Sequence, residues 1–506
     1  MKKWNILLSL TLITGAALRI AVFFQNRSLF LDEANLARNI AQRDLSALLQ
    51  PLDYGQFAPP LFLLATKWNT LLLGNTEYAL RLLPLLAGLA SLFLFYRITT
   101  GLIPSFPARW LAVWIFSFHT TLLRYATECK QYGIDVFAAV LVLWLALRQG
   151  ERPFQWKQAI IWTFLGMVIC WLSMPVVFIL SGVGIYWIYV FWKKNDRASL
   201  GRVAVSIAGW LLSFGLFFFF FLRSDAEGDY LQNYHQPYFL PLLPASAAEW
   251  KQWGGLLFQL LKGFSGSTAA AQVVGGLGLL GAWIGWGRAR KGMVLLWSLP
   301  VLSCLIASGF HYYSLLPRLT LFLTPLLILT AAYGWHVWWE KSGKWPRVAI
   351  LAGLVLMGSR HTGFRFFTRP YLVEDLKGAL AFLEANQHAN EGLYVWKWAV
   401  PGVDFYTRLY AHPYSLKFGE TVNSDQHFAE ELARICDHTP PNGRVWLLYN
   451  HLMSKETRQE MKEELDQFRQ RGLVEEAFQA KNVAVWSWRP QNKADNASAN
   501  TSAEGG

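Results

Sequence analysis

Long apolar blocks separated by short polar stretches dominate the first 360 residues of the chain. Between Lys157 and Lys193, and again between Arg202 and Arg223, no charged side chain occurs. Uninterrupted apolar stretches of roughly 18 residues or more are the mark of membrane-spanning helices, so the pattern predicts a polytopic membrane protein with about eleven spans. The predicted spans lie near residues 5–24, 80–97, 106–123, 132–148, 158–174, 175–192, 203–222, 268–287, 292–310, 319–339 and 346–359.

The distribution of basic residues predicts the topology. The uncharged block over residues 158–192 is too long for one helix of about 20 residues and has basic loops on both sides, so it predicts a hairpin that turns at residues 173–175. Every second loop is basic, and the positive-inside rule assigns these loops and the N-terminus to the cytoplasm. The opposite side then holds the loops 25–78, 124–131, 223–267 and 311–318 and everything after residue 359.

The first loop on that opposite side is far longer than a simple connection. Loops of about 50 residues are uncommon unless they have a function. Apolar residues at helical spacing predict surface or half-embedded helices over residues 35–49 and 61–73, and residues 250–264 in a later loop have the same interfacial character.

After about residue 364 the composition becomes that of a soluble domain. Residues 374–386 and 425–437 have helical periodicity, whereas 393–398, 445–449 and 483–488 are typical of strands. A further charged helix is expected to begin after Ser454, its N-cap, and to end near Gly472.

The predicted fold class is therefore mainly α, with a small α/β domain at the C-terminal end. We expect a transmembrane domain over residues 1–360, an extracytoplasmic α/β domain over 361–490 and a disordered polar tail over 491–506.

Composition narrows the class of protein further. The chain is 54% hydrophobic and only 16% charged, whereas soluble domains carry about 25% charged residues. This excludes a soluble enzyme, a disordered chain and a disulfide scaffold. The net charge of +13 comes from basic residues in short loops, which predicts membrane lipids rather than nucleic acid as partners. The four cysteines have no paired spacing for a metal or redox motif, so no cofactor is predicted, and a divalent metal remains open.

The strongest candidate chemistry is the adjacent pair Asp32 and Glu33, just past the predicted first span. The pair opens the long loop, and a carboxylate there is suited to act as general base toward an acceptor hydroxyl, with the other as its neighbour. The alternative is that both are solvated or pair with Arg27 and Arg38.

Two further polar clusters lie at the same predicted membrane depth. Cations beside a phosphate leaving group stabilise its developing charge, although boundary charges are also often simple anchors. The candidate ligands are Arg124, Glu128, Lys130, Gln131 and Tyr132 in one cluster, and Tyr312 and Arg318 in the other.

Two polar residues fall inside predicted spans. His119 is expected to be a hydrogen-bonded core residue, and Arg19 to extend toward the membrane surface, although ionisable residues within membranes also tend to be functional.

Three motifs carry a family resemblance over roughly residues 1–340. They are Leu-Asp-Glu at 31–33, Pro-Pro-Leu-Phe at 59–62 and Gly-Asn-Thr-Glu-Tyr-Ala-Leu-Arg-Leu-Leu-Pro at 74–84. They resemble the membrane glycosyltransferases of the protein-mannosyltransferase and aminoarabinose-transferase superfamily, which have the GT-C fold.

The resemblance implies residue roles. It makes Asp32 the catalytic base, matches residues 128–132 to the family's second acidic–basic patch and places residues 312–318 near the donor phosphate. One position departs from the pattern: many members have Lys before the Pro-Pro pair, and here Ala58 occupies it. The cations left to bind phosphate are Lys130, Arg124 and Arg318.

The predicted activity is an inverting glycosyl transfer from a polyprenyl-phosphate sugar to an envelope lipid, glycan or protein at the outer face of the inner membrane. Such a donor carries its own leaving group, which agrees with the lack of a Gly-rich nucleotide-binding motif. Two other classes stay open: a transporter or flippase of a lipid-linked substrate, and a non-catalytic lipid-binding scaffold.

Overall fold

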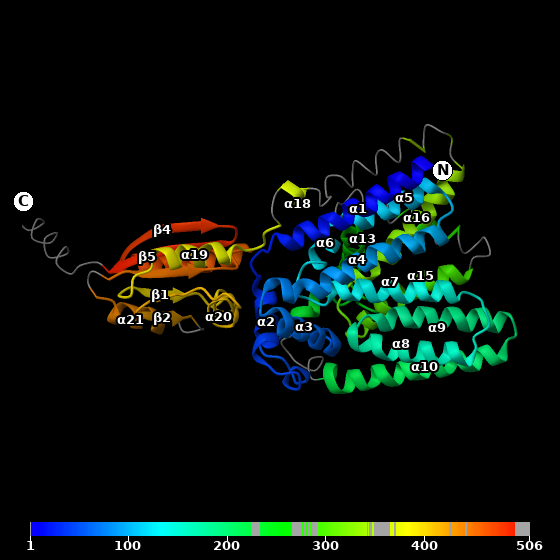
Figure 1. Ribbon diagram of the computed structural model, residues 1–506, viewed down its shortest axis with the longest axis horizontal. Coiled ribbons are helices and arrows are strands. Elements are labelled where there is room, and N and C mark those ends of the chain that lie inside the picture. Colours follow the sequence, from blue (N-terminus) through cyan, green and yellow to red (C-terminus); the bar gives the residue numbers. More distant parts are fainter. Residues whose placement is uncertain are drawn as a thin grey trace, which may run out of the picture.

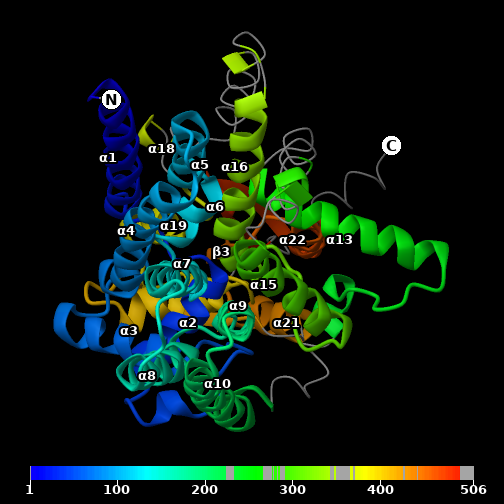
Figure 2. The same ribbon diagram turned by 90° about the vertical axis from the view of Figure 1, so that its right-hand side faces the viewer.

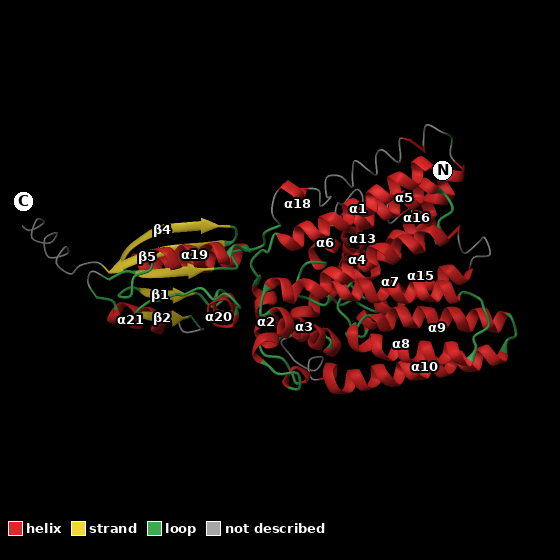
Figure 3. Ribbon diagram, viewed as in Figure 1, coloured by secondary structure: helices red, strands yellow, loops and turns green. Residues whose placement is uncertain are grey.

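A bundle of apolar helices and a smaller sheet-containing domain at one end of it make up the molecule (Figure 1). The computed structural model describes residues 2–223, 233–265, 276, 279–281, 283–284, 291–341, 343, 347–348, 365–368, 371–424, 428–440 and 443–490. Strands occur in the C-terminal domain, and the rest of the described chain is helical or irregular (Figure 3). The predicted fold class is confirmed.

The bundle helices follow the predicted spans closely. They are α1 (Lys2–Phe24), α4 (Glu77–Leu102), α5 (Phe106–Phe118), α6 (Thr120–Tyr125), α7 (Tyr132–Gln149), α8 (Trp156–Leu172), α9 (Val176–Lys193), α10 (Arg197–Phe217) with the π-helical η2 (Phe218–Leu222), α15 (Lys291–Gly309) and α16 (Thr324–Lys341), which follows the short η4 (Leu321–Leu323). Figure 2 shows several of them nearly end-on. The helices α1, α4, α7, α9 and the combined α10 and η2 are long and apolar enough to cross a membrane, so the chain is a multi-pass membrane protein.

The hairpin predicted within the long uncharged block is present. Helix α8 ends at Leu172 and α9 begins at Val176, with the turn between them. Most of the predicted spans at 268–287 and 346–359 lies outside the described residues.

The span predicted over 106–123 is interrupted in the middle. Helix α5 ends at Phe118, and the ring of His119 caps α6 by accepting a hydrogen bond from the Leu122 amide. The prediction that Arg19 extends toward the membrane surface is wrong. Arg19 is buried and donates to the Phe116 and Ser117 carbonyls at 3.2 and 3.0 Å. The reason is that a helix end leaves carbonyls without partners, which a buried guanidinium satisfies.

The long first loop contains α2 (Leu31–Gln42), η1 (Ala47–Leu49) and α3 (Pro60–Leu73), and a later loop contains η3 (Gln236–Tyr238) and α13 (Ala247–Ser265). Helix α2 begins four residues earlier than predicted and is shorter, so Asp32 and Glu33 lie in its first turn. Acidic residues are favoured there because they offset the positive end of the helix dipole.

The C-terminal domain is a five-stranded sheet with strand order β2-β1-β3-β5-β4. Strand β1 pairs in parallel with β2 and β3, whereas β5 is antiparallel to β3 and β4. Its elements are α19 (Leu376–Asn386), β1 (Gly392–Val395), α20 (Val400–Asp404), the π-helical η5 (Phe405–Leu409), β2 (Glu420–Asn423), α21 (Phe428–His438), β3 (Val445–Tyr449), α22 (Lys455–Arg469), β4 (Gly472–Ala480) and β5 (Val483–Pro490), and the short α18 (Arg365–Thr368) precedes them.

Two strands at the sheet edges were not predicted. Ser454 caps α22 as expected, but α22 ends at Arg469, and Gly472 begins β4 instead of closing the helix. Strands β2 and β4 carry charged residues and have only one neighbour each, a composition that protects an edge from aggregation but weakens the apolar alternation on which strand prediction depends.

The domain packs on the first loop of the bundle. Tyr406 Oη accepts a hydrogen bond from the Leu29 amide at 2.8 Å and contacts Glu77 Oε1 at 3.0 Å. Lys377 Nζ lies 2.9 Å from the same Glu77 oxygen, and Arg38 of α2 pairs with Asp404 of α20 at 2.7 Å. These buried or half-buried contacts fix the position of the domain beside α2.

Candidate active site

A cavity of about 820 Å³ opens between α2, the 54–57 turn, the start of α7 and the 311–319 segment. One part of its wall is apolar and comes from α9, α10 and η2, where Phe178, Phe214 and Phe218 lie. The only charged side chains among its described lining residues are Asp32, Lys130 and Arg318. The cavity therefore joins a polar end with a net positive charge to an apolar side formed by membrane helices.

Asp32 is the acid of this site. It lies in the first turn of α2, its side chain is 31% exposed, and its Oδ2 atom is 3.0 Å from Nη1 of Arg318. A carboxylate held by a cation yet open to a cavity is available to accept a proton from a ligand.

Arg318 reaches Asp32 from the far side of the cavity. Its Nη2 donates to the hydroxyl of Tyr234 at 3.3 Å, and its Nε is buried without a hydrogen-bond partner in the part of the chain that the structure describes. Burial alone would lower the pKa of Arg318, but Tyr132 and Asp32 nearby raise it, so the guanidinium stays charged. An unsatisfied donor on a charged group is suited to an anionic ligand atom.

Lys130 supplies the second cation. Its Nζ donates to Oε1 of Gln56 at 2.6 Å, while Asp32, the one carboxylate among the described lining residues, pairs with Arg318. Burial lowers the pKa of Lys130, and Asp32 opposes that shift. A lysine whose charge is not matched by a bonded carboxylate is a natural partner for a phosphate.

The neighbouring predicted residues complete the polar end. Gln131 donates to the Phe57 carbonyl at 3.4 Å, and its buried Oε1 has no partner within the described chain. Tyr132 also lines the cavity, and Tyr312, 72% exposed, stands at it.

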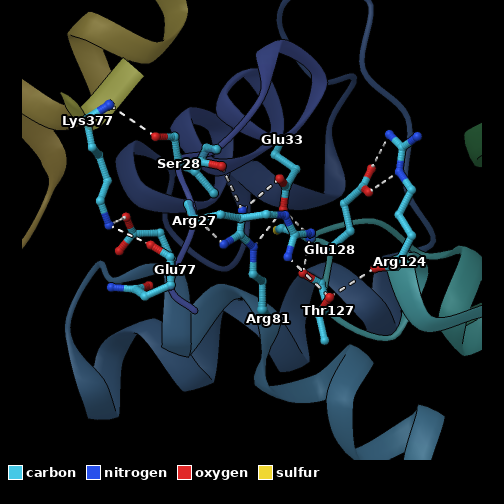
Figure 4. A network of polar contacts seen from close by, with 12 residues as sticks. Arg27, Ser28, Glu33, Glu77, Arg81, Arg124, Thr127, Glu128 and Lys377 are labelled. Atoms are coloured by element: carbon cyan, nitrogen blue, oxygen red, sulfur yellow. Dashed lines mark hydrogen bonds and ion pairs between the residues drawn. The ribbon is translucent and has the colours of Figure 1, made fainter. Parts of the chain in front are cut away.

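Glu33, next to Asp32, lies in a different environment. It is 1% exposed and accepts two hydrogen bonds from Arg81, at 2.9 and 2.8 Å, and one from the Cys129 amide at 2.7 Å (Figure 4). Burial raises its pKa, but Arg81 and Arg27 outweigh that effect, so the pKa of Glu33 is lowered and the group is ionised. Glu33 does not line the cavity.

Arg124 and Glu128 also lie outside the cavity lining. They bind each other, with Arg124 Nε 2.6 Å from Glu128 Oε2, beside the Glu33 network (Figure 4). Burial raises the pKa of Glu128, and Arg124 acts against it. The turn after α6 thus places Glu128 inside the protein and residues 130–132 at the cavity, while Arg124, in the last turn of α6, is not among the lining residues.

Several lining residues were not identified from the sequence. Tyr54, Gln56 and Tyr234 are among them. The turn at Tyr54-Gly55 carried one signal, the glycine, because glycine favours positive φ: both residues have positive φ, 64° and 59°. The described residues contain no group of three His, Cys, Asp or Glu side chains suited to a metal ion.

Comparison with known proteins identifies the fold. No family model and no curated protein matches the sequence. The structure is similar to that of ArnT from Cupriavidus metallidurans, solved in the apo state (TM-score 0.53) and bound to undecaprenyl phosphate (TM-score 0.52). Each comparison covers 96% of this chain and 98% of the ArnT chain at 14% identity.

An oligosaccharyltransferase of Archaeoglobus fulgidus aligns over 86% of this chain and 67% of its own with 11% identity and a TM-score of 0.45, too low to carry an argument. At 14% identity the similarity to ArnT establishes the fold alone, which is a GT-C fold.

Proposed function

We propose that the chain is an inverting glycosyltransferase that moves a sugar from a polyprenyl-phosphate donor to an envelope lipid, glycan or protein. The observation that carries the proposal is the composition of the cavity, where one carboxylate and two cations meet an apolar wall of membrane helices. A lipid phosphate has the matching form, with an anionic head and an apolar chain. The ArnT structure of the same fold is bound to undecaprenyl phosphate, which supports a donor of this class.

The reaction needs few groups. Asp32 takes the proton of an acceptor hydroxyl as the oxygen forms a bond to the anomeric carbon, and the bond between that carbon and the phosphate oxygen breaks. The electron pair leaves with the polyprenyl phosphate, whose charge Lys130 and Arg318 stabilise. A single displacement on the face opposite the leaving group inverts the anomeric configuration.

The two cations also account for Ala58 at the position where the resembling family often has Lys. Ala58 is buried, and Lys130 reaches the cavity beside Gln56, which belongs to the same turn as Phe57. In this proposal Lys130 takes the part of the missing lysine. A bound phosphate would accept a hydrogen bond from Lys130 in place of Gln56 or in addition to it.

The test of the mechanism is Asp32→Asn. Mass spectrometry of envelope glycans with and without the gene identifies the transferred sugar, and transfer is then timed with the purified protein in lipid nanodiscs. We expect a fall of about 10²- to 10⁴-fold, which is the usual contribution of a general base. Asp53→Asn is the matched control, because Asp53 lies in the same loop, pairs with Arg43 and does not line the cavity.

Two outcomes would decide against the proposal. An unchanged rate in Asp32→Asn would remove Asp32 from catalysis. Movement of labelled undecaprenyl-phosphate sugar across the bilayer, with no new glycosidic bond, would identify a transporter instead.

We also propose an orientation, with the N-terminus in the cytoplasm and the cavity and C-terminal domain outside. The warrant is the basic bias of alternate loops. Ser502→Cys, in a Cys436→Ser background because Cys436 is the one native cysteine that is not buried, should react with a membrane-impermeant thiol reagent in intact spheroplasts. Labelling only after lysis would place the domain in the cytoplasm and remove the envelope acceptor.

A further inference from the structure

Trp398 is the one described residue of the C-terminal domain that lines the cavity. Its side chain is 37% exposed, whereas Trp396, two positions earlier, is fully buried. Trp398 follows β1, whose carboxyl end points with that of its parallel neighbour β3 toward the helical bundle (Figure 1). In open α/β sheets, ligands bind outside the carboxyl ends of the parallel strands.

Trp398 is held at a fixed place relative to the carboxylate of the active site. Helix α20 begins two residues after it, and Asp404 at the end of α20 pairs with Arg38 of α2, the helix that carries Asp32. Both partners are nearly buried, with side-chain exposures of 12% and 11%. The Arg38 guanidinium in turn lies 4.1 Å from the ring centroid of Tyr54, which also lines the cavity.

The surroundings of Trp398 are built from side chains that are themselves fixed. Lys397 lies with its Nζ 5.6 Å from the centroid of the Trp398 ring and is paired with Glu460. The ring of His451 is 6.1 Å away, and its Nδ1 is 2.7 Å from Oε1 of the buried Glu374. His451 adopts a φ of 64°, a conformation that non-glycine residues rarely take. Lys397 and His451 therefore hold the ring of Trp398, which stays partly exposed and lines the cavity.

From this geometry we infer that Trp398 forms the acceptor subsite, an aromatic surface on which a sugar ring of the acceptor lies while its hydroxyl reaches Asp32. The inference rests on the proposed function and assigns the acceptor to a saccharide class, free or lipid-linked. The C–H face of a pyranose is weakly positive and complements the electron-rich face of an indole.

The acceptor, rather than the donor, is the ligand that fits this position. The cations for the donor phosphate, Lys130 and Arg318, and the apolar wall all belong to the helical bundle. Trp398 approaches from the domain beyond the bundle end, so the two substrates would enter from the two structural parts and meet at Asp32.

The first measurement is saturation-transfer NMR on the full-length protein in nanodiscs. The probes are the methyl glycosides of glucose, mannose, galactose and N-acetylglucosamine. We expect saturation transfer to at least one glycoside in the wild type. The affinity for that glycoside should fall about tenfold in Trp398→Ala and be retained in Trp398→Phe, which keeps an aromatic face. Leu473→Ala, an exposed apolar residue on the edge strand β4, is the control and should leave the signal unchanged.

The second measurement separates acceptor from donor. With the envelope fraction that the wild type labels as acceptor, Trp398→Ala should raise KM about tenfold and change kcat by less than about twofold. Its affinity for undecaprenyl phosphate should equal that of the wild type.

The outcomes distinguish this inference from the proposed function. Wild-type glycoside binding that Trp398→Ala does not weaken, or no binding at all, overturns the subsite. Loss of undecaprenyl phosphate affinity in Trp398→Ala overturns it as well, because Trp398 would then serve the donor. If the wild-type protein does not bind undecaprenyl phosphate and does not transfer sugar, the proposed function is refuted. Glycoside binding then still decides whether Trp398 is a saccharide site.

Discussion

Asp32 and Glu33 are adjacent carboxylates in one helical turn, and they lie in opposite environments. Asp32 is 31% exposed, lines the cavity and has one ion-pair contact with Arg318. Glu33 is 1% exposed and accepts three hydrogen bonds, two from Arg81 and one from the Cys129 amide. The first has capacity left for a ligand, and the second has its acceptor positions occupied by the protein.

The comparison extends to the cations. Arg81 is bound by Glu33 and by the Arg27 carbonyl inside the fold (Figure 4), whereas Arg318 keeps a buried Nε without a partner among the described residues. Charge alone therefore does not identify a functional residue in this protein. What distinguishes the two arginines is whether other groups of the protein already fill the hydrogen-bonding capacity of the charged side chain.

The largest expected effect separates the two arginines by stability. Arg81→Ala leaves the buried Glu33 without its cation, and such a loss costs about 3–5 kcal/mol. Arg318→Ala breaks a pair that is about 30% exposed at both ends and should cost less than about 1 kcal/mol. Unfolding of the purified proteins by SDS in mixed micelles measures both. Equal losses would show that the two pairs are not different in kind.

Arg318, whose removal should hardly affect stability, should have a large effect on the rate of sugar transfer. In nanodiscs, Arg318→Ala should lower sugar transfer about 10²- to 10³-fold, the cost of removing one preorganised donor to developing charge. Arg318→Lys should recover part of the rate. Arg43→Ala is the control, since Arg43 pairs with the exposed Asp53 and does not line the cavity. A normal rate in Arg318→Ala would leave Lys130 as the only phosphate ligand.

Glu464 is a third carboxylate to compare, because it is buried and has no bonded cation among the described residues. It accepts hydrogen bonds from Tyr394 Oη and Trp396 Nε1 at 3.0 Å each, and burial raises its pKa to about 7. Because the pKa of Glu464 is higher in the folded state than in the unfolded state, protonated Glu464 favours folding. This stabilisation is complete below the pKa of the unfolded state and is lost as the pH rises through about 7.

We therefore expect the free energy of unfolding of the C-terminal domain to fall by about 3 kcal/mol between pH 4.5 and pH 7. Hydrogen exchange of the β1 amides, corrected for the intrinsic rate at each pH, measures this. Glu464→Gln should remove the dependence. A domain whose protection rises with pH over this range would contradict the assignment.

A smaller loss than that of Arg81→Ala is expected when both members of the buried pair are removed together. Glu33→Met combined with Arg81→Met removes both buried charges, and apolar replacement of such a pair is often nearly neutral. The Cys129 amide and the Arg27 carbonyl lose partners, so we expect a loss of about 1–2 kcal/mol. The same SDS titration applies, and a double variant as unstable as Arg81→Ala would show that the charges themselves stabilise the fold.

Much of the architecture was predictable because it depends on local pattern. The spans, the hairpin at residues 173–175 and the N-cap Ser454 follow from apolar length, flanking charge and capping chemistry. Errors occurred where the local pattern was weak, at the edge strands β2 and β4 and at the early start of α2, and where a strong pattern misled, at the break before α6. At His119 the apolar pattern continues, and the Phe116 and Ser117 carbonyls before the break accept hydrogen bonds from Arg19, which belongs to another helix.

The sequence by itself determined a membrane-embedded helical chain with carboxylates and cations near the predicted ends of its spans. Which of them face a common cavity was decided only by tertiary structure. Successive helix residues differ by about 100° in direction, so Asp32 and Glu33 diverge, and a shift of one residue in packing would exchange them. The partner of Asp32 is 286 positions away in the sequence, and Trp398 comes from a separate domain. No local periodicity encodes contacts of that range, because they arise only when the whole chain packs.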